Sequence, residues 1–278
     1  MLRTQAMALS AVICVFAFAA SASAGKPETG FLNRTLTAGA KAAPFQVYVP
    51  ANWTKKKKWP VILFLHGAGE RGDDGLVQTE VGIGTAIRRY VSRVPFIVVL
   101  PQCLKNRWWT EPEMQAVALK ALDQSIAEFN GDPERLYLTG LSMGGYGTWA
   151  IASSHPGRFA AFAVICGGVR PPPGSAPRSP ETPDLASVAD PYTPIAQKVG
   201  KTPVWVFHGG ADPVVPVTES RKMVEALKAA GGNVKYNEYE GVRHDSWVKA
   251  YAEPDFFEWL LSCRLEKSAK NTGQARTR

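Results

Sequence analysis

Short, wholly apolar runs recur along the 278-residue chain, and each stops at a glycine, a proline or a polar residue. The clearest are Val61–Leu65, Phe96–Leu100, Phe159–Cys166 and Val204–Phe207. Such runs are typical of strands that are covered on both faces. Between the second and the third run, apolar residues of 114–129 recur every three or four positions, which predicts an amphipathic helix. Buried strands that alternate with helices predict the α/β class, with a mainly parallel central sheet and helices on both faces.

The remaining elements fit the same architecture. Phe31–Leu36 and Pro44–Pro50 predict an antiparallel hairpin at the N-terminal end of the sheet. Further strands are predicted at Leu136–Thr139 and Val234–Tyr239, and further helices at 142–154, 223–230 and 256–261. No linker divides the sequence, so we expect a single domain over residues 25–265.

The first 24 residues have the layout of a signal peptide. Arg3 supplies a positive charge, Ala6–Ala20 is a mostly apolar run, and Ala22-Ser23-Ala24 is a small-residue cleavage site. The apolar run is shorter than the roughly 18 residues that a spanning helix needs. We therefore expect cleavage near Ala24, no stable membrane insertion, and export to the periplasm or the medium.

Two segments depart from the alternation of strands and helices. Residues 171–194 contain eight prolines, which predicts an irregular excursion over the surface. Residues 266–278 are polar and basic, and we expect them to form a disordered tail. The formal net charge of +8 is spread along the chain, and the run Lys55–Lys58 is interpreted as a solvated turn. No nucleic-acid partner is therefore predicted.

The strongest catalytic motif is Gly140-Leu141-Ser142-Met143-Gly144. A predicted strand stops just before it, and a predicted helix follows at once. In this context G-x-S-x-G places a serine on a tight turn, where its hydroxyl is exposed and the helix N-terminus favours negative charge. We interpret Ser142 as a nucleophile; the alternative is that it only caps the helix.

A serine nucleophile needs a base, and the base needs an acid that orients it. His244 lies in a polar loop after the last predicted strand, at the same sheet edge as Ser142, and is the predicted base. Asp212 follows the strand that ends near His208 and is the predicted acid. Asp245, adjacent to His244, is a weaker candidate for the acid because it would point elsewhere.

Acyl transfer also needs donors for the oxyanion of a tetrahedral intermediate. The backbone N–H of Met143, directly after the nucleophile, is the first predicted donor. The glycine-rich turn His66-Gly67-Ala68-Gly69 follows a buried strand, and Ala68 is predicted to supply the second donor. His66 itself is interpreted as architectural. The turn lacks the lysine and the spacing of a phosphate-binding loop, which argues against a nucleotide site.

Three segments together resemble the α/β-hydrolase superfamily: 65–72 (LHGAGERG), 139–149 (TGLSMGGYGTW) and 208–212 (HGGAD). The order Ser142, Asp212, His244 along the chain is also the order of that superfamily. More narrowly, the segments resemble exported bacterial serine esterases of the prolyl-oligopeptidase-like group, near polyhydroxyalkanoate-depolymerase-like and feruloyl-esterase-like proteins. The resemblance extends from about Pro44 to Leu261.

The resemblance implies carboxylic-ester hydrolysis through an acyl-enzyme, without a metal or a cofactor. It also implies that Gln102, Trp108 and Trp109 line the acyl or alcohol pocket, although core packing explains the tryptophans nearly as well. We expect a hydrolase of small or aryl esters. A serine peptidase or a polyester depolymerase would use the same triad, and an inactive binding module would keep only the fold. The sequence leaves open the ester, the oligomeric state and any disulfide among Cys103, Cys166 and Cys263.

Overall fold

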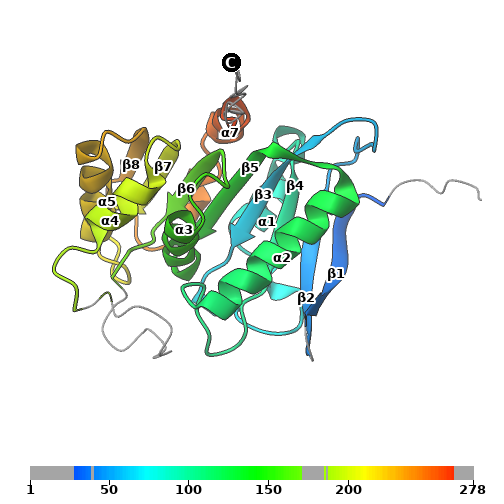
Figure 1. Cartoon of the computed structure of the whole chain (residues 1–278), viewed down its shortest axis with the longest axis horizontal. Coiled ribbons are helices and arrows are strands. Elements are labelled where there is room, and N and C mark those ends of the chain that lie inside the picture. The colour runs from blue at the N-terminus through cyan, green and yellow to red at the C-terminus, as the bar shows by residue number, and fades with distance from the viewer. Residues whose placement is uncertain (1–27, 39–40, 171–184, 186, 266–278) are drawn as a thin grey trace, which may run out of the picture.

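Eight strands form one sheet in the order β1-β2-β4-β3-β5-β6-β7-β8 (Figure 1). The structure, a computed structural model, describes residues 28–38, 41–170, 185 and 187–265. The predicted signal peptide, the predicted tail and most of the predicted excursion lie outside these residues. The strands are β1 (Gly30–Ala38), β2 (Lys41–Val49), β3 (Trp59–Leu65), β4 (Ile97–Pro101), β5 (Gly131–Leu141), β6 (Ala161–Ile165), β7 (Val204–Gly209) and β8 (Val234–Tyr239).

Strand β2 pairs antiparallel with β1 and with β4, and the other neighbouring strands are parallel. The predicted N-terminal hairpin and mainly parallel sheet are thereby confirmed. Because β3 to β8 run in one direction, their carboxyl ends meet at one edge of the sheet. The loops that follow these strands are therefore the ones that can bring distant residues together.

Helices cover both faces of the sheet, as predicted. One core lies between the sheet and α2 to α5, and a second lies between the sheet and α1, α6 and α7. The helices are α1 (Ile83–Arg89), α2 (Pro112–Phe129), α3 (Met143–Ser154), α4 (Tyr192–Val199), α5 (Thr218–Ala229), α6 (Trp247–Ala250) and α7 (Phe256–Ser262). Short 3₁₀ turns precede or follow them at η1 (Ala68–Glu70), η2 (Val77–Thr79) and η3 (Val91–Arg93).

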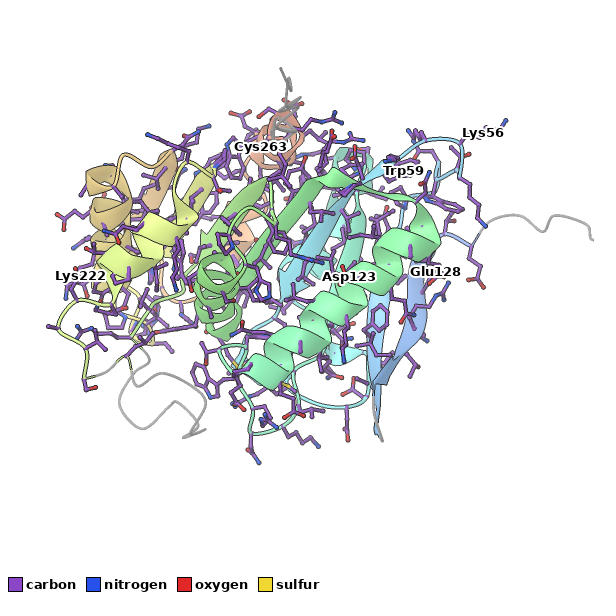
Figure 2. The ribbon with its side chains drawn as sticks, in the orientation of Figure 1. Lys56, Trp59, Asp123, Glu128, Lys222 and Cys263 are labelled. Atoms are coloured by element: carbon purple, nitrogen blue, oxygen red, sulfur yellow. The ribbon has the colours of Figure 1, made fainter. Side chains whose placement is uncertain are left out.

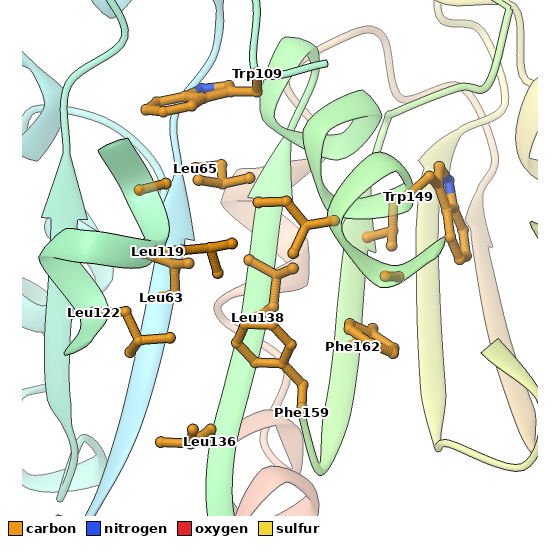
Figure 3. Close-up of a cluster of buried hydrophobic side chains, with 14 of the residues drawn as sticks. Leu63, Leu65, Trp109, Leu119, Leu122, Leu136, Leu138, Trp149, Phe159 and Phe162 are labelled. Atoms are coloured by element: carbon orange, nitrogen blue, oxygen red, sulfur yellow. The ribbon is translucent and has the colours of Figure 1, made fainter. Parts of the chain in front are cut away.

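The two cores explain why the strands read as unbroken apolar runs. Along β3, Leu63 and Leu65 pack in the first core, whereas Ile62 and Phe64 pack in the second. Successive side chains of a strand point to opposite faces, so a strand covered on both faces needs apolar residues at every position. Figure 3 shows Leu63 and Leu65 beside Leu138, from the neighbouring β5.

One boundary prediction is wrong. The irregular excursion was expected to extend to Pro194, but α4 begins at Tyr192. Pro194 lies in the first turn of α4, where the missing N–H has no intrahelical partner to lose. Helix α1 was not predicted, because its seven residues are too few to show a clear apolar period.

The lysine run forms an exposed turn, as predicted. Lys55–Lys58 are all exposed, and Lys56 lies at the tip of the turn (Figure 2). The ammonium group of Lys57 lies 4.0 Å from the centre of the Trp59 ring. No helix among the described residues is long and apolar enough to cross a membrane. Cys103, Cys166 and Cys263 are buried free thiols.

Candidate active site

Ser142 sits on a strained turn between β5 and α3. Its backbone has φ 52° and ψ −120°, a region that non-glycine residues rarely occupy. Its N–H donates to the carbonyl of Ile165 on the neighbouring β6, at 3.0 Å, which holds the turn against the sheet. The serine therefore follows one strand and precedes one helix with no intervening loop, as the sequence predicted.

Glycine at 144 is what allows the turn to be so tight. A Cβ atom on Gly144 would lie 1.9 Å from the carbonyl oxygen of Leu65 at the end of β3. Similarly, a Cβ atom on Gly140 would lie 2.2 Å from the carbonyl oxygen of Gly144. The start of α3 is thus pressed against the backbone of β3, and the oxyanion loop that follows β3 is brought beside Ser142.

The structure joins the three predicted triad residues in one hydrogen-bonded chain. Nδ1 of His244 lies 2.7 Å from Oδ2 of Asp212, and Nε2 of His244 lies 2.9 Å from Oγ of Ser142. Asp212 follows β7 and His244 follows β8, so two loops and the turn at Ser142 meet at the carboxyl edge of the sheet. Trp247 packs edge-on against the imidazole of His244, at 5.4 Å between ring centres.

Asp212 is held as a carboxylate by several donors. Its side chain has no exposed surface, and this burial opposes ionisation. Hydrogen bonds from His208, from His244 and from the backbone N–H groups of Val214 and Val215 outweigh the burial and hold the pKa of Asp212 well below its ordinary value. An ionised Asp212 accepts a hydrogen bond from Nδ1–H of His244. That tautomer leaves Nε2 of His244 as an acceptor for the Ser142 hydroxyl.

His208 supports the acid from the other side. Its Nε2 lies 3.0 Å from the carbonyl of Val215 and 3.3 Å from Oδ2 of Asp212, so Nε2 must carry the proton. Its Nδ1 then accepts from the hydroxyl of Ser220, at 2.7 Å. His208 is fully buried and fixes the loop that carries Asp212. The exposed carboxylate of Asp245 has no contact of this kind among the described residues.

The two predicted oxyanion donors lie next to the serine. Ala68 opens η1 and Met143 opens α3, so neither backbone N–H has a helical partner. Neither N–H donates a hydrogen bond within the described ranges. A Cβ atom on Gly67 would lie 3.7 Å from Cβ of Ser142, which places the start of the Ala68 turn beside the nucleophile.

His66 fixes the shape of this oxyanion loop. Its Nε2 accepts from the backbone N–H of Cys103 at 2.9 Å, so Nδ1 carries the proton and donates to the carbonyl of Gly67 at 2.6 Å. Burial is the main cause that lowers the pKa of His66 to about 4, so the ring stays neutral near neutral pH. The expected architectural role of His66 agrees with these contacts.

Gln102 braces the same loop with both ends of its amide. Oε1 accepts from the backbone N–H of Gly75 at 2.7 Å, and Nε2 donates to the carbonyl of Glu70 at 3.1 Å. The side chain is 4% exposed. The amide of Gln102 therefore positions the loop. A substrate could contact the side chain, as predicted, only if the loop moved and exposed it.

The two tryptophans predicted beside the pocket are both buried. Trp109 is 0% exposed, and its indole N–H donates to the carbonyl of His66 at 3.0 Å. Trp108 is 8% exposed and packs edge-on against Tyr146 on α3, at 6.0 Å between ring centres. These contacts match the core-packing alternative for Trp109, whereas Trp108 keeps a small exposed surface.

Glu219 is a structural residue of the site that the sequence did not reveal. Its Oε2 accepts from the backbone N–H groups of Val169 and Arg170, each at 2.9 Å, in the loop that follows β6. Its Oε1 accepts from the hydroxyl of Tyr192 at 2.7 Å. An acidic residue in the first turn of a helix is common, so the sequence carried no signal for this role.

One group of side chains in the described part of the chain has the spacing of metal ligands. Ligand atoms of Cys166, Asp212 and His244 all lie within 4.8 Å of one another. Asp212 and His244 already share a hydrogen bond, and burial raises the pKa of the Cys166 thiol to about 12. The carboxylate and the imidazole of this group are thus already committed to each other, an arrangement that suits proton transfer through His244.

A serine on a strand–turn–helix, a histidine hydrogen-bonded to it and a buried carboxylate, all on a mainly parallel sheet, are typical of the α/β-hydrolase fold. The family model named Esterase and described as "Putative esterase" matches residues 40–253, and the chain belongs to this family. The predicted membership of the α/β-hydrolase superfamily is thereby confirmed.

Individual relatives agree with this assignment. The chain is 27% identical over 215 residues to the endo-1,4-beta-xylanase/feruloyl esterase of Xylanibacter ruminicola, a match that covers 72% of this chain and 26% of that protein. It is 26% identical over 220 residues to carboxylesterase SOBER1 of Arabidopsis thaliana, covering 68% of this chain and 89% of that protein. The chain thus spans about a quarter of the first relative and most of the second.

Comparison with a solved structure also indicates an esterase of this fold. The crystal structure of a thermostable esterase superposes on this chain with a TM-score of 0.69 and 34% sequence identity. The match covers 84% of this chain and 63% of that one. The chain therefore belongs to an esterase family and has the α/β-hydrolase fold.

Proposed function

We propose that this protein is an exported serine carboxylic-ester hydrolase that acts on small or aryl esters through an acyl-enzyme. The observation that carries the proposal is the continuous chain of hydrogen bonds from Ser142 through His244 to Asp212. Nucleophile, base and orienting acid stand in hydrogen-bond contact in the order that acyl transfer needs. The feruloyl esterase in the name of the Xylanibacter ruminicola relative supports the inclusion of aryl esters.

The reaction follows from these contacts. Oγ of Ser142 attacks the ester carbonyl while Nε2 of His244 takes the hydroxyl proton, and the imidazolium is stabilised by the Asp212 carboxylate. The backbone N–H groups of Met143 and Ala68 donate hydrogen bonds that stabilise the negative charge developing on the carbonyl oxygen. His244 then returns the proton to the leaving alcohol. Water, deprotonated by His244, attacks the acyl carbonyl; the bond to Oγ of Ser142 breaks, His244 returns the proton to Oγ, and the acid is released.

Labelling with a fluorophosphonate tests the proposal against an inactive binding module. The reagent should add one phosphonyl group to the wild-type chain, and peptide mass spectrometry should place it on Ser142. The matched control is Ser142→Ala, which should stay unlabelled. Absence of labelling in the wild-type chain, with the fold intact, would support the binding module.

A substrate panel then separates the enzyme alternatives. Nitrophenyl esters of increasing acyl length, methyl ferulate, acetyl-xylan, a polyester film and an acyl-peptide should be compared under one condition. We expect the highest kcat/KM on the small or aryl esters. A preference for the peptide would favour a serine peptidase, and a preference for the film would favour a polyester depolymerase.

The proposed export rests on the N-terminal sequence alone. A positive residue, an apolar run and the cleavage site Ala22-Ser23-Ala24 follow one another in the order of a signal peptide. N-terminal sequencing of the protein recovered from the periplasm or medium should begin at Gly25. A chain that stays in the cytoplasm with Arg3 still attached would contradict export.

A further inference from the structure

A cavity of about 710 Å³ lies between α2, α3 and α4, beside the helix that carries the nucleophile at its start. Its size falls within the range of small-molecule sites, roughly 300–1,000 Å³. None of the three triad residues lines it. Its walls are mostly apolar and include Leu119 on α2, Tyr146, Trp149 and Ala150 on α3, and Ile195 on α4. We call it the α2–α4 cavity.

Three hydrogen-bond acceptors around the α2–α4 cavity already have donors. Oε1 of Gln115 accepts from the hydroxyl of Ser154 at 3.1 Å, and the carbonyl of Thr110 accepts from Nε2 of Gln115 at 3.0 Å. The carboxylate of Asp123, on α2 (Figure 2), is paired with Arg158. A ligand that brings further donors would therefore find few free partners here.

The polar groups that remain free are donors. The indole N–H of Trp149 is buried, and it has no hydrogen-bond partner among the described residues. Lys120 on α2 and Lys198 on α4 line the cavity, and neither is paired with a carboxylate in the described part of the chain. The Trp149 nitrogen has no accessible surface, so the two lysines are the donors that a ligand in this cavity can meet, and they favour a negative charge.

We propose that the α2–α4 cavity binds an amphipathic monocarboxylate, with its acyl or aryl body against the apolar walls and its carboxylate facing the free donors. A carboxylate offers only acceptors and a negative charge, which matches the ammonium groups of Lys120 and Lys198. A small inorganic anion would leave the apolar walls unfilled, and a neutral alcohol would leave both lysines without a counter-charge. Apolar burial and charge complementarity together therefore select an acid with a hydrocarbon body.

The cavity also has a physical link to the catalytic turn. Tyr146 lines it, and the backbone N–H of Tyr146 donates to the carbonyl of Ser142 at 3.2 Å. The acid released by ester hydrolysis belongs to the same chemical class as the ligand inferred here. That connection rests on the proposed function, whereas binding to the cavity does not.

Calorimetric titration of the full Ser142→Ala chain tests the inference without turnover. The probes are octanoate, with acetate and octanol as matched controls that lack the hydrocarbon body and the charge respectively. Octanoate should bind at one site, acetate should show no measurable binding, and octanol should bind about threefold to tenfold more weakly, in line with the small gain from exposed charges. No binding of octanoate at low-millimolar concentration, or equal binding of acetate, would overturn the proposal.

Substitutions then locate the site. Ala150→Phe, on a partly buried position of α3, should fill the α2–α4 cavity and weaken octanoate binding at least tenfold. Its matched control is Ala252→Phe, at a partly buried alanine that lines a separate cavity of about 230 Å³ between α1 and α6. The control should bind octanoate as the parent chain does. Unchanged affinity in Ala150→Phe would assign the binding to another place, including the catalytic cleft.

Charge removal gives a second test that does not disturb the core. Lys120 and Lys198 are exposed, so Lys120→Met with Lys198→Met should leave the fold intact. The double variant should lose about threefold to tenfold in octanoate affinity and keep its octanol affinity. Equal losses for both probes would contradict a role for charge. These titrations are independent of ester turnover, so an inactive enzyme could still show the site and an active one could lack it.

Discussion

Acid should destabilise the folded chain through one buried histidine. His66 is 0% exposed at the end of β3, and burial lowers its pKa from 6.5 to about 4, although the Gly67 carbonyl partly opposes this. Because the pKa is lowered in the folded state, the unfolded chain takes up the proton first as the pH falls. The stability that depends on neutral His66 is therefore fully present above about pH 6.5 and is lost between about pH 6.5 and pH 4.

The size of the effect follows from the same two values. A fall in pKa from 6.5 to about 4 corresponds to on the order of 3 kcal/mol of unfolding free energy. Near pH 5.5 the unfolded chain binds almost one proton more at this site, so stability should change by about 1 kcal/mol per pH unit. Asp212 does not interfere, because its lowered pKa affects stability only below the ordinary range of a carboxyl.

Urea denaturation at pH 7.5, 6.5, 5.5 and 5.0 measures this slope. The variant His66→Asn keeps an amide that can donate to Gly67 but has no group that titrates in this window. We expect it to be less stable at pH 7.5 and to have a slope flatter by about 1 kcal/mol per pH unit. His155→Asn, at a partly exposed histidine after α3, serves as the control for a histidine-to-asparagine change outside the buried site. Equal slopes for wild type and His66→Asn between pH 5 and pH 6 would refute the reasoning.

Four further predictions concern the site and its supports. Ser142→Ala should lower nitrophenyl-ester hydrolysis by on the order of 10⁴-fold with an unchanged circular-dichroism spectrum, and a loss of only about tenfold would exclude it as the nucleophile. Asp212→Asn should lower kcat by several orders of magnitude and Asp245→Asn far less, so the reverse order would show that the acid is misassigned. Gly144→Ala should prevent recovery of folded protein, because its Cβ atom would meet Leu65 O at 1.9 Å, whereas Gly69→Ala, with nothing within 4 Å, should fold normally by thermal melting. Glu219→Gln should lower the free energy of unfolding by about 1–2 kcal/mol in urea, since one amide oxygen cannot serve all three donors; an unchanged value would argue against its role in holding the loop.

The sequence predicted the strands and the triad for one physical reason. A strand buried on both faces must be apolar throughout, so its end is visible wherever a glycine or a polar residue follows. Ser142 and Asp212 follow such ends, whereas His244 follows the partly exposed edge strand β8; parallel strands bring all three carboxyl ends to one edge. The hydrogen-bonded chain that the structure contains could therefore be anticipated without any knowledge of side-chain positions.

Contacts between loops leave no comparable pattern in the sequence. Gln102 was expected at the wall of the pocket. The orientation of a glutamine side chain depends on the groups it can hydrogen-bond, and here these are the backbone groups of Glu70 and Gly75. Helix α4 was not predicted, because Pro191 at its N-cap and Pro194 in its first turn resemble helix breakers in the sequence alone. Glu219 looked like an ordinary acidic residue at a helix start until the loop after β6 was seen against it.

Three histidines lie at or after strand ends, and their hydrogen-bond partners in the structure distinguish their roles. His66 binds backbone groups with both ring nitrogens, and His208 binds Ser220 and the Val215–Asp212 loop with both of its own. In the described structure, His244 alone joins the carboxylate through one nitrogen and a serine hydroxyl through the other. A ring with both nitrogens committed to the scaffold can only position a loop, whereas a ring with one nitrogen toward a hydroxyl can move a proton. Burial and hydrogen-bond partners therefore explain why three chemically identical side chains serve as two supports and one candidate base.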